Sequence, residues 1–186
     1  MSDTTSDLSL LEGVLEKLEG LLAGVRPDQR ALPTPCKEWD VGALEGHLVG
    51  WLRYFAAKAN REQPDPDPGA TRAGADPAAE FHAAAEHLLQ GLREQESGAV
   101  ALAEGEMPPA MLRVLLTGEY VVHGWDLATA TGQPVPFTDV EAEAALAMRS
   151  TLTPENRGTM FGPEVPVSPD APALTRLIAF SGRQPS

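Results

Sequence analysis

Hydrophobic residues recur at three- and four-residue steps along most of the chain, which is the period of an amphipathic α-helix. The first such segment ends before Pro27 and Pro33. The loop TPCKEWD follows, and its last residue, Asp40, is suited to cap a second helix from about Val41 to Arg61. The apolar stripe of the first helix consists of Leu11, Val14, Leu15, Leu18, Leu21, Leu22 and Val25.

A stretch rich in Pro, Asp and Gly separates the second helix from a third. It extends from Gln63 to Asp76 and has no core-forming residues, so the sequence predicts a mobile surface connection. Asp76 is suited to cap the third helix, with Pro77 at the first helical position. The inner face of this helix is predicted to consist of Phe81, Ala84, Ala85, Leu88 and Leu92.

The fourth predicted helix opens within EGEMPPAM, near Pro108 or Pro109, and runs to about Thr131. Gly132 is suited to end it, because glycine readily adopts the left-handed conformation found after a helix.

The rest of the chain predicts short helices joined by a long Pro/Gly-rich connection. Thr138 and Glu141 form a capping-box pattern for a helix over about 140–151, and ALTRLIAF predicts a last short helix. No segment shows a convincing β-strand period. The pattern therefore predicts an all-α fold, an antiparallel four-helix bundle with short extra C-terminal helices, as a single domain over residues 1–186.

The composition of the chain excludes some classes of binding partner. A formal net charge of -13 argues against nucleic acid and anionic membranes, because binding phosphate needs clustered Lys and Arg. One cysteine, Cys36, excludes an internal disulfide framework and suits a reducing cytoplasm. There is no apolar run of membrane-spanning length and no secretory signal pattern, so we expect a cytoplasmic protein.

Chemically unusual residues lie on two of the apolar stripes. Within GEYVVHGWDLATATG, Glu119 precedes His123 by one helical turn on a stripe with several leucines, and His47 lies on the stripe of the second helix. A buried carboxylate is costly unless it is paired or binds a cation. Glu119, His123 and His47 could together bind a divalent ion such as zinc, with nickel, iron or cobalt also compatible. Spacing alone leaves open a buried Glu119–His123 ion pair with His47 as a core histidine.

The segments TPCKEWDVGALEGHLVGW, EYVVHGWDLATATGQP and FGPEVPVSPDAPALTRLIAFSGRQP resemble the DinB-like metal-binding superfamily. They are most similar to the actinobacterial branch that includes the N-terminal metal-binding domain of mycothiol-dependent maleylpyruvate isomerase. The resemblance implies a helical bundle that holds a divalent metal through His47, His123 and Glu119. Many relatives carry His at the position of Glu119, whereas the isomerase branch carries Glu.

The same resemblance bears on activity. The isomerase has a further C-terminal domain, and this chain is too short to contain one, so isomerisation of maleylpyruvate is not carried over. The resemblance implies a zinc-dependent transferase or isomerase that uses a thiol such as mycothiol on a small electrophile. Three alternatives stay open. The metal could support hydrolysis, the protein could be a non-catalytic metal- or ligand-binding bundle for regulation or stress response, or it could be an inactive structural bundle. Bundles of this kind often pair, so a homodimer is a further expectation.

Other residues leave two interpretations open. Asp126 could orient an imidazole. It could also be an exposed acid or a local helix contact, and this second interpretation is favoured. Cys36 could exchange thiols but is expected to pack. His82 and His87 are expected to lie on a solvated face. Aromatic residues that could either wall a pocket or pack in the core are Trp51, Phe55 and Trp125, while Tyr120 is undecided.

Overall fold

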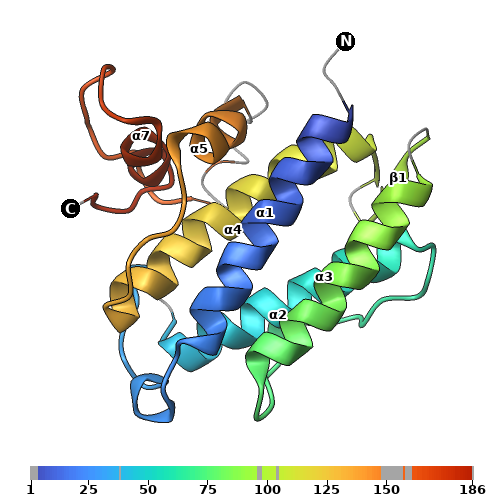
Figure 1. The fold of residues 1–186 in the computed structure, drawn as a ribbon, viewed down its shortest axis with the longest axis horizontal. Helices are drawn as coiled ribbons and strands as arrows, with labels where there is room; N and C mark the ends of the chain where they lie inside the picture. Colours follow the sequence, from blue (N-terminus) through green and yellow to red (C-terminus); the bar gives the residue numbers. More distant parts are fainter. Residues whose placement is uncertain are drawn as a thin grey trace.

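The computed structural model describes residues 4–37, 39–95, 98–103, 105–147, 157 and 161–185, and this part of the chain is mostly helical (Figure 1). The helices are α1 (Thr4–Ala23), α2 (Val41–Ala59), α3 (Pro77–Glu94), α4 (Pro109–Thr131), α5 (Asp139–Leu146) and α7 (Ala173–Phe180). The short elements are η1 (Pro27–Gln29), η2 (Pro68–Ala70), β1 (Val100–Leu102) and β2 (Gly105–Met107).

The predicted helix boundaries are confirmed where local capping chemistry sets them. Asp40 accepts a hydrogen bond from the Ala43 N–H at 2.8 Å, and Asp76 accepts one from the Ala79 N–H at 3.0 Å. Gly132 ends α4 in the left-handed conformation, with φ of 71°. The capping box of Thr138 and Glu141 is present at the start of α5. The last part of the predicted fifth helix, residues 148–151, lies outside the described residues.

A small hairpin corrects the prediction that no strand is present. β1 and β2 pair antiparallel, with Val100 opposite Met107 and Leu102 opposite Gly105. β2 occupies the GEM of EGEMPPAM, so α4 begins only at Pro109. Strands of three residues are too short to show an alternating pattern, which is why the sequence did not predict them.

Pairwise packing of α1 to α4 places α2 beside α4. α1 packs against α3 and α4, and α2 packs against the same two helices from the other side. Their inward side chains, from Leu11 on α1 to Leu127 on α4, belong to one hydrophobic core. α5 packs on α4 and α7 packs on α5, so the C-terminal segment lies beside α4 and away from α3 (Figure 1).

The connection from Gln63 to Asp76 lies on the surface, as predicted, and packs along α2. Pro64 and Pro68 are buried, which corrects the prediction that this stretch has no core-forming residues. A Cβ atom added at Gly46 would lie 2.4 Å from the Thr71 carbonyl oxygen. The loop therefore approaches α2 as closely as it does because glycine lacks a side chain at that point.

Gly46→Ala should destabilise the protein by about 1–3 kcal/mol, because the added methyl group would collide with backbone that cannot rotate away. Urea unfolding measures the difference. The matched control is Gly13→Ala on α1, where an added Cβ meets nothing within 4 Å. That variant should be neutral or more stable by up to about 1 kcal/mol. Equal midpoints for the two variants would contradict the close approach.

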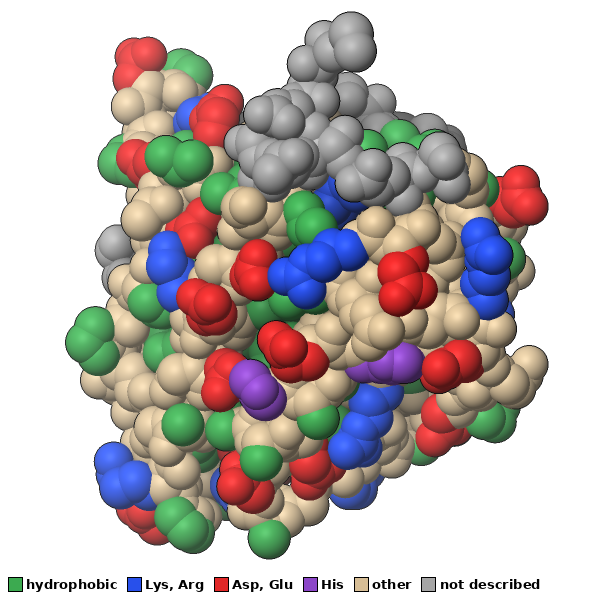
Figure 2. All heavy atoms as spheres, turned by 45° about the vertical axis from the view of Figure 1, so that its right-hand side comes forward, with side chains coloured by type: hydrophobic (Ala, Val, Ile, Leu, Met, Phe, Trp, Pro, Cys, Tyr) green, Lys and Arg blue, Asp and Glu red, His purple; other side chains and the backbone are tan. Residues whose placement is uncertain are grey.

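The surface carries charges of both signs. On the face drawn in Figure 2, acidic and basic side chains alternate, hydrophobic ones are scattered, and histidines lie beside acidic groups. His82 and His87 are exposed as predicted, with side chains 56% and 39% accessible, and they contact Glu19 and Glu62 at 3.0 Å. Among the described helices, none is both long and apolar enough to cross a membrane.

Candidate metal centre between α2 and α4

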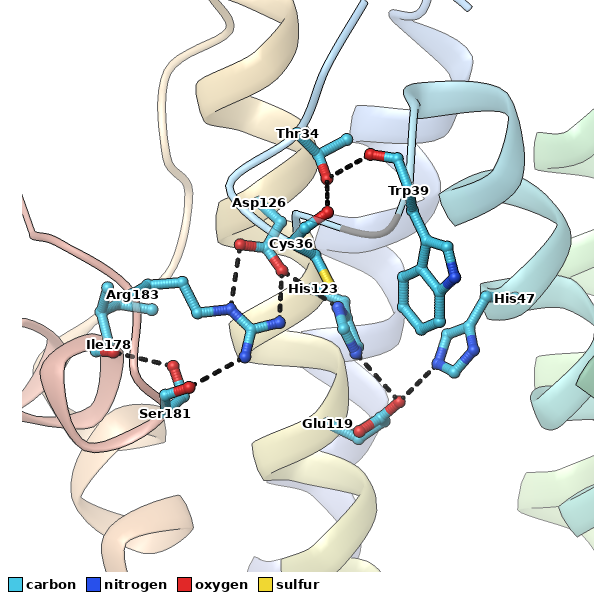
Figure 3. Close-up of polar contacts among 10 residues, drawn as sticks. All are labelled: Thr34, Cys36, Trp39, His47, Glu119, His123, Asp126, Ile178, Ser181 and Arg183. Atoms are coloured by element: carbon cyan, nitrogen blue, oxygen red, sulfur yellow. Dashed lines mark hydrogen bonds and ion pairs between the residues drawn. The ribbon is translucent and has the colours of Figure 1, made fainter. Parts of the chain in front are cut away.

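His47, Glu119 and His123 come together where α2 packs against α4 (Figure 3). Each offers one ligand atom, and these atoms lie within 4.8 Å of one another. Both imidazoles present Nε2 to the same carboxylate oxygen, Oε1 of Glu119, at 2.8 Å from His47 and 3.3 Å from His123. The structure thus brings together the three residues that the sequence singled out.

The two residues on α4 meet because they are four positions apart and so lie one above the other. The cluster lies at the margin of the core rather than inside it. The side chains of His47 and Glu119 are 15% and 28% accessible, whereas that of His123 is 9% accessible. A group bound here therefore has one protein-lined side and one side that solvent can reach.

Asp126 holds the far side of the His123 ring. Its side chain is fully buried, which rules out an exposed acid and leaves the orienting partner and the local helix contact. His123 Nδ1 lies 3.1 Å from Asp126 Oδ2, and Arg183 donates to both carboxylate oxygens, at 3.2 Å from Nε and 2.9 Å from Nη2. The contact between Asp126 and His123 joins residues three apart on α4, so it is a local helix contact that is also placed to orient the imidazole. Arg183 was missed because nothing in SGRQP distinguishes it from a surface arginine.

Trp39 covers both imidazoles and was also missed. Its ring centroid lies 4.2 Å from that of His47 and 5.4 Å from that of His123. The Thr34 hydroxyl donates to the Trp39 carbonyl at 2.9 Å, which fixes the loop in front of α2. The only available signal was its place immediately before the capping Asp40. Trp51 lies farther from His47, with ring centroids 6.3 Å apart.

The remaining candidates lie in the core or the loop. Phe55 and Trp125 are buried in the hydrophobic core, as the packing interpretation predicts. Tyr120 is fully buried and stacks edge-on against Phe81 with centroids 5.7 Å apart, and its hydroxyl has no hydrogen-bond partner among the described residues. Cys36 is half-buried, and its carbonyl accepts hydrogen bonds from Thr34 and Trp39.

The charges of the cluster are strongly coupled. Burial opposes ionisation of Glu119, but the adjacent imidazoles of His123 and His47 hold its pKa well below the ordinary value. Burial likewise opposes the charged form of His123, yet the carboxylates of Glu119 and Asp126 together raise its pKa to about 9. Without a metal, an imidazolium between two carboxylates therefore occupies the site at neutral pH.

The metal-free protein should lose stability as the pH rises from 6.5 through about 9. The pKa of His123 is raised from 6.5 in the unfolded chain to about 9 in the folded protein, so its contribution is complete below 6.5 and lost above 9. Glu119 contributes above 4.5 and loses its contribution as the pH falls through its depressed pKa. Thermal midpoints of chelator-treated protein measure this. His123→Gln should flatten the alkaline decline, and parallel curves for the two proteins would contradict the assignment.

The donor set fits a zinc-type ion. Zinc bonds of about 2.0–2.2 Å to nitrogen and oxygen in a tetrahedral site place ligand atoms about 3.3 Å apart. The distance of 3.3 Å between His123 and Glu119 meets this value, and that of 2.8 Å from His47 needs a small side-chain adjustment. The Nδ1 contact of His123 with a carboxylate is also the usual arrangement of a metal-binding histidine.

The fold and the cluster thus define a mostly helical protein with a candidate His/Glu metal centre. Residues 11–128 match the family described as the mycothiol maleylpyruvate isomerase N-terminal domain, and the chain belongs to this family. The match includes the three clustered residues and ends before α5. It confirms the resemblance inferred from the sequence.

Similar proteins extend the likeness beyond the family domain. An uncharacterised protein of Mycobacterium tuberculosis, found in two strains, is 35% identical over 172 residues, covering 88% of this chain and 90% of its own length. Crystal structures of the mycothiol-dependent maleylpyruvate isomerase and of a mutant of it share the fold. The mutant has a TM-score of 0.65 at 15% identity and the other structure 0.59 at 14%, each covering 88% of this chain and 75% of the isomerase chain.

Proposed function

We propose that the protein binds a divalent metal ion, with zinc the best suited, and uses it with a low-molecular-weight thiol such as mycothiol to transform a small electrophile. The proposed ligands are His47, Glu119 and His123. The observation that carries the proposal is their convergence: donor atoms from two helices lie within 4.8 Å of one another at the margin of the core. The reaction would be that of a transferase or an isomerase.

Two nitrogen ligands and one carboxylate suit a borderline ion, and zinc is the commonest of these in such sites. Nickel, iron and cobalt share the donor preference. Three protein ligands leave at least one coordination position open, as in reactive zinc sites. The 28% accessibility of Glu119 and 15% of His47 mean that solvent reaches the cluster.

Bound zinc would favour the deprotonated, nucleophilic form of a thiol at neutral pH. The chain's own residues would then act as ligands and supports rather than as proton-transfer groups. Asp126 would keep the ligating nitrogen of His123 aimed at Glu119, and Trp39 would shield the ligating imidazoles from water on one side. The family's name and the mycothiol dependence of the structural neighbours support the choice of thiol.

We also infer that α1 to α4 form an antiparallel four-helix bundle and that residues 1–186 make one domain. The pairwise packing of α1 and α2 against both α3 and α4 supports this arrangement. The fold of the isomerase, shared over 88% of this chain, supports it as well.

Zinc-loaded protein supplied with mycothiol should consume a small electrophile such as a maleyl compound at least ~100-fold faster than chelator-treated protein, since a catalytic metal ion contributes several kcal/mol and each ~1.4 kcal/mol is tenfold in rate. Absorbance at the electrophile and thiol titration measure the turnover. Glu119→Gln should abolish it and His87→Ala should retain it. Zinc binding without thiol-dependent turnover would favour the non-catalytic binding protein, and turnover without thiol would indicate hydrolysis.

A further inference from the structure

The buried carboxylate of Asp126 is held by a residue far along the chain. Arg183 lies 57 positions away and contacts both oxygens of Asp126 through Nε and Nη2, while its Nη1 donates to the Ser181 carbonyl at 3.0 Å. Its side chain is 9% accessible. All three nitrogens of the guanidinium are therefore engaged within the protein, so its role is not to meet solvent or a substrate.

The backbone around Arg183 is fixed as tightly as its side chain. The Arg183 N–H donates to the Ile178 carbonyl at the end of α7, at 3.2 Å. Gly182 turns the chain with φ of 83°, and an added Cβ there would lie 2.9 Å from Gly162. The close approach and the positive φ both require glycine, so the last turn delivers the guanidinium to one place against α4.

The consequence for His123 follows from hydrogen-bond chemistry. An ionised carboxylate only accepts, so the Asp126 contact requires a proton on Nδ1 of the ring. When Nε2, the nitrogen that faces Glu119, gives up its proton to bind a metal, the contact with Asp126 keeps the remaining proton on Nδ1 and so leaves the lone pair on Nε2. Figure 3 shows this series of contacts, from Arg183 through Asp126 and His123 to Glu119.

We propose that Arg183 is a positioning residue for the metal centre: it fixes Asp126, which fixes the tautomer and the orientation of His123. This inference rests on the proposed function. The family match ends at residue 128, so the C-terminal segment completes a site whose proposed ligands all lie within the matched domain. Without the guanidinium, one imidazole alone among the described side chains would face the buried charge of Asp126, and the ring would no longer be held in one orientation.

The test compares full-length wild type, Arg183→Gln and Arg183→Lys by zinc competition against a chromophoric chelator. Arg183→Gln should weaken zinc binding about 10–100-fold, the usual effect of losing an outer partner of a ligating histidine. Lysine keeps the charge without the two-pronged contact, so Arg183→Lys should recover part of the affinity. The control is Arg176→Gln, which removes an arginine of the same C-terminal segment from Glu143, a carboxylate on α5 rather than in the site. It should bind zinc like the wild type.

Two further readouts separate positioning from general damage. The visible spectrum of the cobalt-loaded protein should change in Arg183→Gln and not in Arg176→Gln. In the zinc-free protein, a slowly exchanging Nδ1–H proton of His123 should be visible by NMR in the wild type and lost in Arg183→Gln. If Arg183→Gln does not fold, the same comparisons are made with Arg183→Lys.

The outcomes distinguish the inference from the function on which it rests. Wild-type zinc affinity and a retained Nδ1–H resonance in the Arg183 variants would overturn the inference while leaving the metal centre intact. A wild-type protein that binds no zinc, but loses the Nδ1–H resonance on Arg183→Gln, would overturn the proposed function and preserve the positioning of the ring.

Discussion

Replacing His47 or His123 by alanine should remove the bound metal, while the wild type purified without chelator carries about one zinc per chain. Each variant leaves two of the three proposed ligands, and reactive zinc sites need three protein ligands. The loss should exceed the 10–100-fold effect of removing an outer partner. Elemental analysis of the untagged protein, combined with circular dichroism to verify folding, measures the result.

The control for this experiment is His87→Ala. His87 lies on α3, is exposed, and contacts Glu62 at 3.0 Å, so its removal should leave metal content unchanged. Loss of zinc from this variant would show that the ligand set is wrong. A wild type that takes up no metal even after reconstitution would support the alternative of a Glu119–His123 ion pair with His47 as a core histidine.

Asp126→Ala should destabilise the protein by about 3–5 kcal/mol, even without metal. Asp126 is fully buried and Arg183 is 9% accessible, so the variant leaves a guanidinium in the interior without its counter-charge. Removing one partner of a buried pair is costly because the other remains desolvated and unpaired. Urea unfolding of chelator-treated protein measures the loss.

The matched control is Glu143→Ala, which breaks the contact of Glu143 with Arg176 at 2.6 Å. The side chain of Glu143 is 63% accessible, and exposed pairs contribute only about 0–1 kcal/mol. Similar losses in the two variants would mean that Asp126 and Arg183 do not form a buried pair in solution.

The sequence predicted the helices well because their signals are local. Asp40 and Asp76 cap the helices that they precede, and Gly132 ends α4, since each acts within one turn of its own position. The hairpin of β1 and β2 was missed because three-residue strands are stabilised by their pairing, which no local pattern records.

The candidate site was likewise predictable only where its signals are local. Glu119 and His123 could be placed together because a helix fixes residues four apart. His47 could be added only through its place on an apolar stripe and through the family resemblance. The sequence could not show that the cluster lies at the margin of the core, because exposure depends on which neighbours cover each side chain.

By itself, the sequence determined the helices of the chain, its family and the stripe that carries Glu119 and His123, because these depend on short-range periodicity and recurring motifs. The tertiary structure decided what surrounds them. His47 meets Glu119 across 72 positions and Arg183 meets Asp126 across 57, while Trp39 reaches the imidazoles from a loop. Contacts between segments so far apart depend on how the helices pack, and a one-dimensional pattern carries no record of that packing.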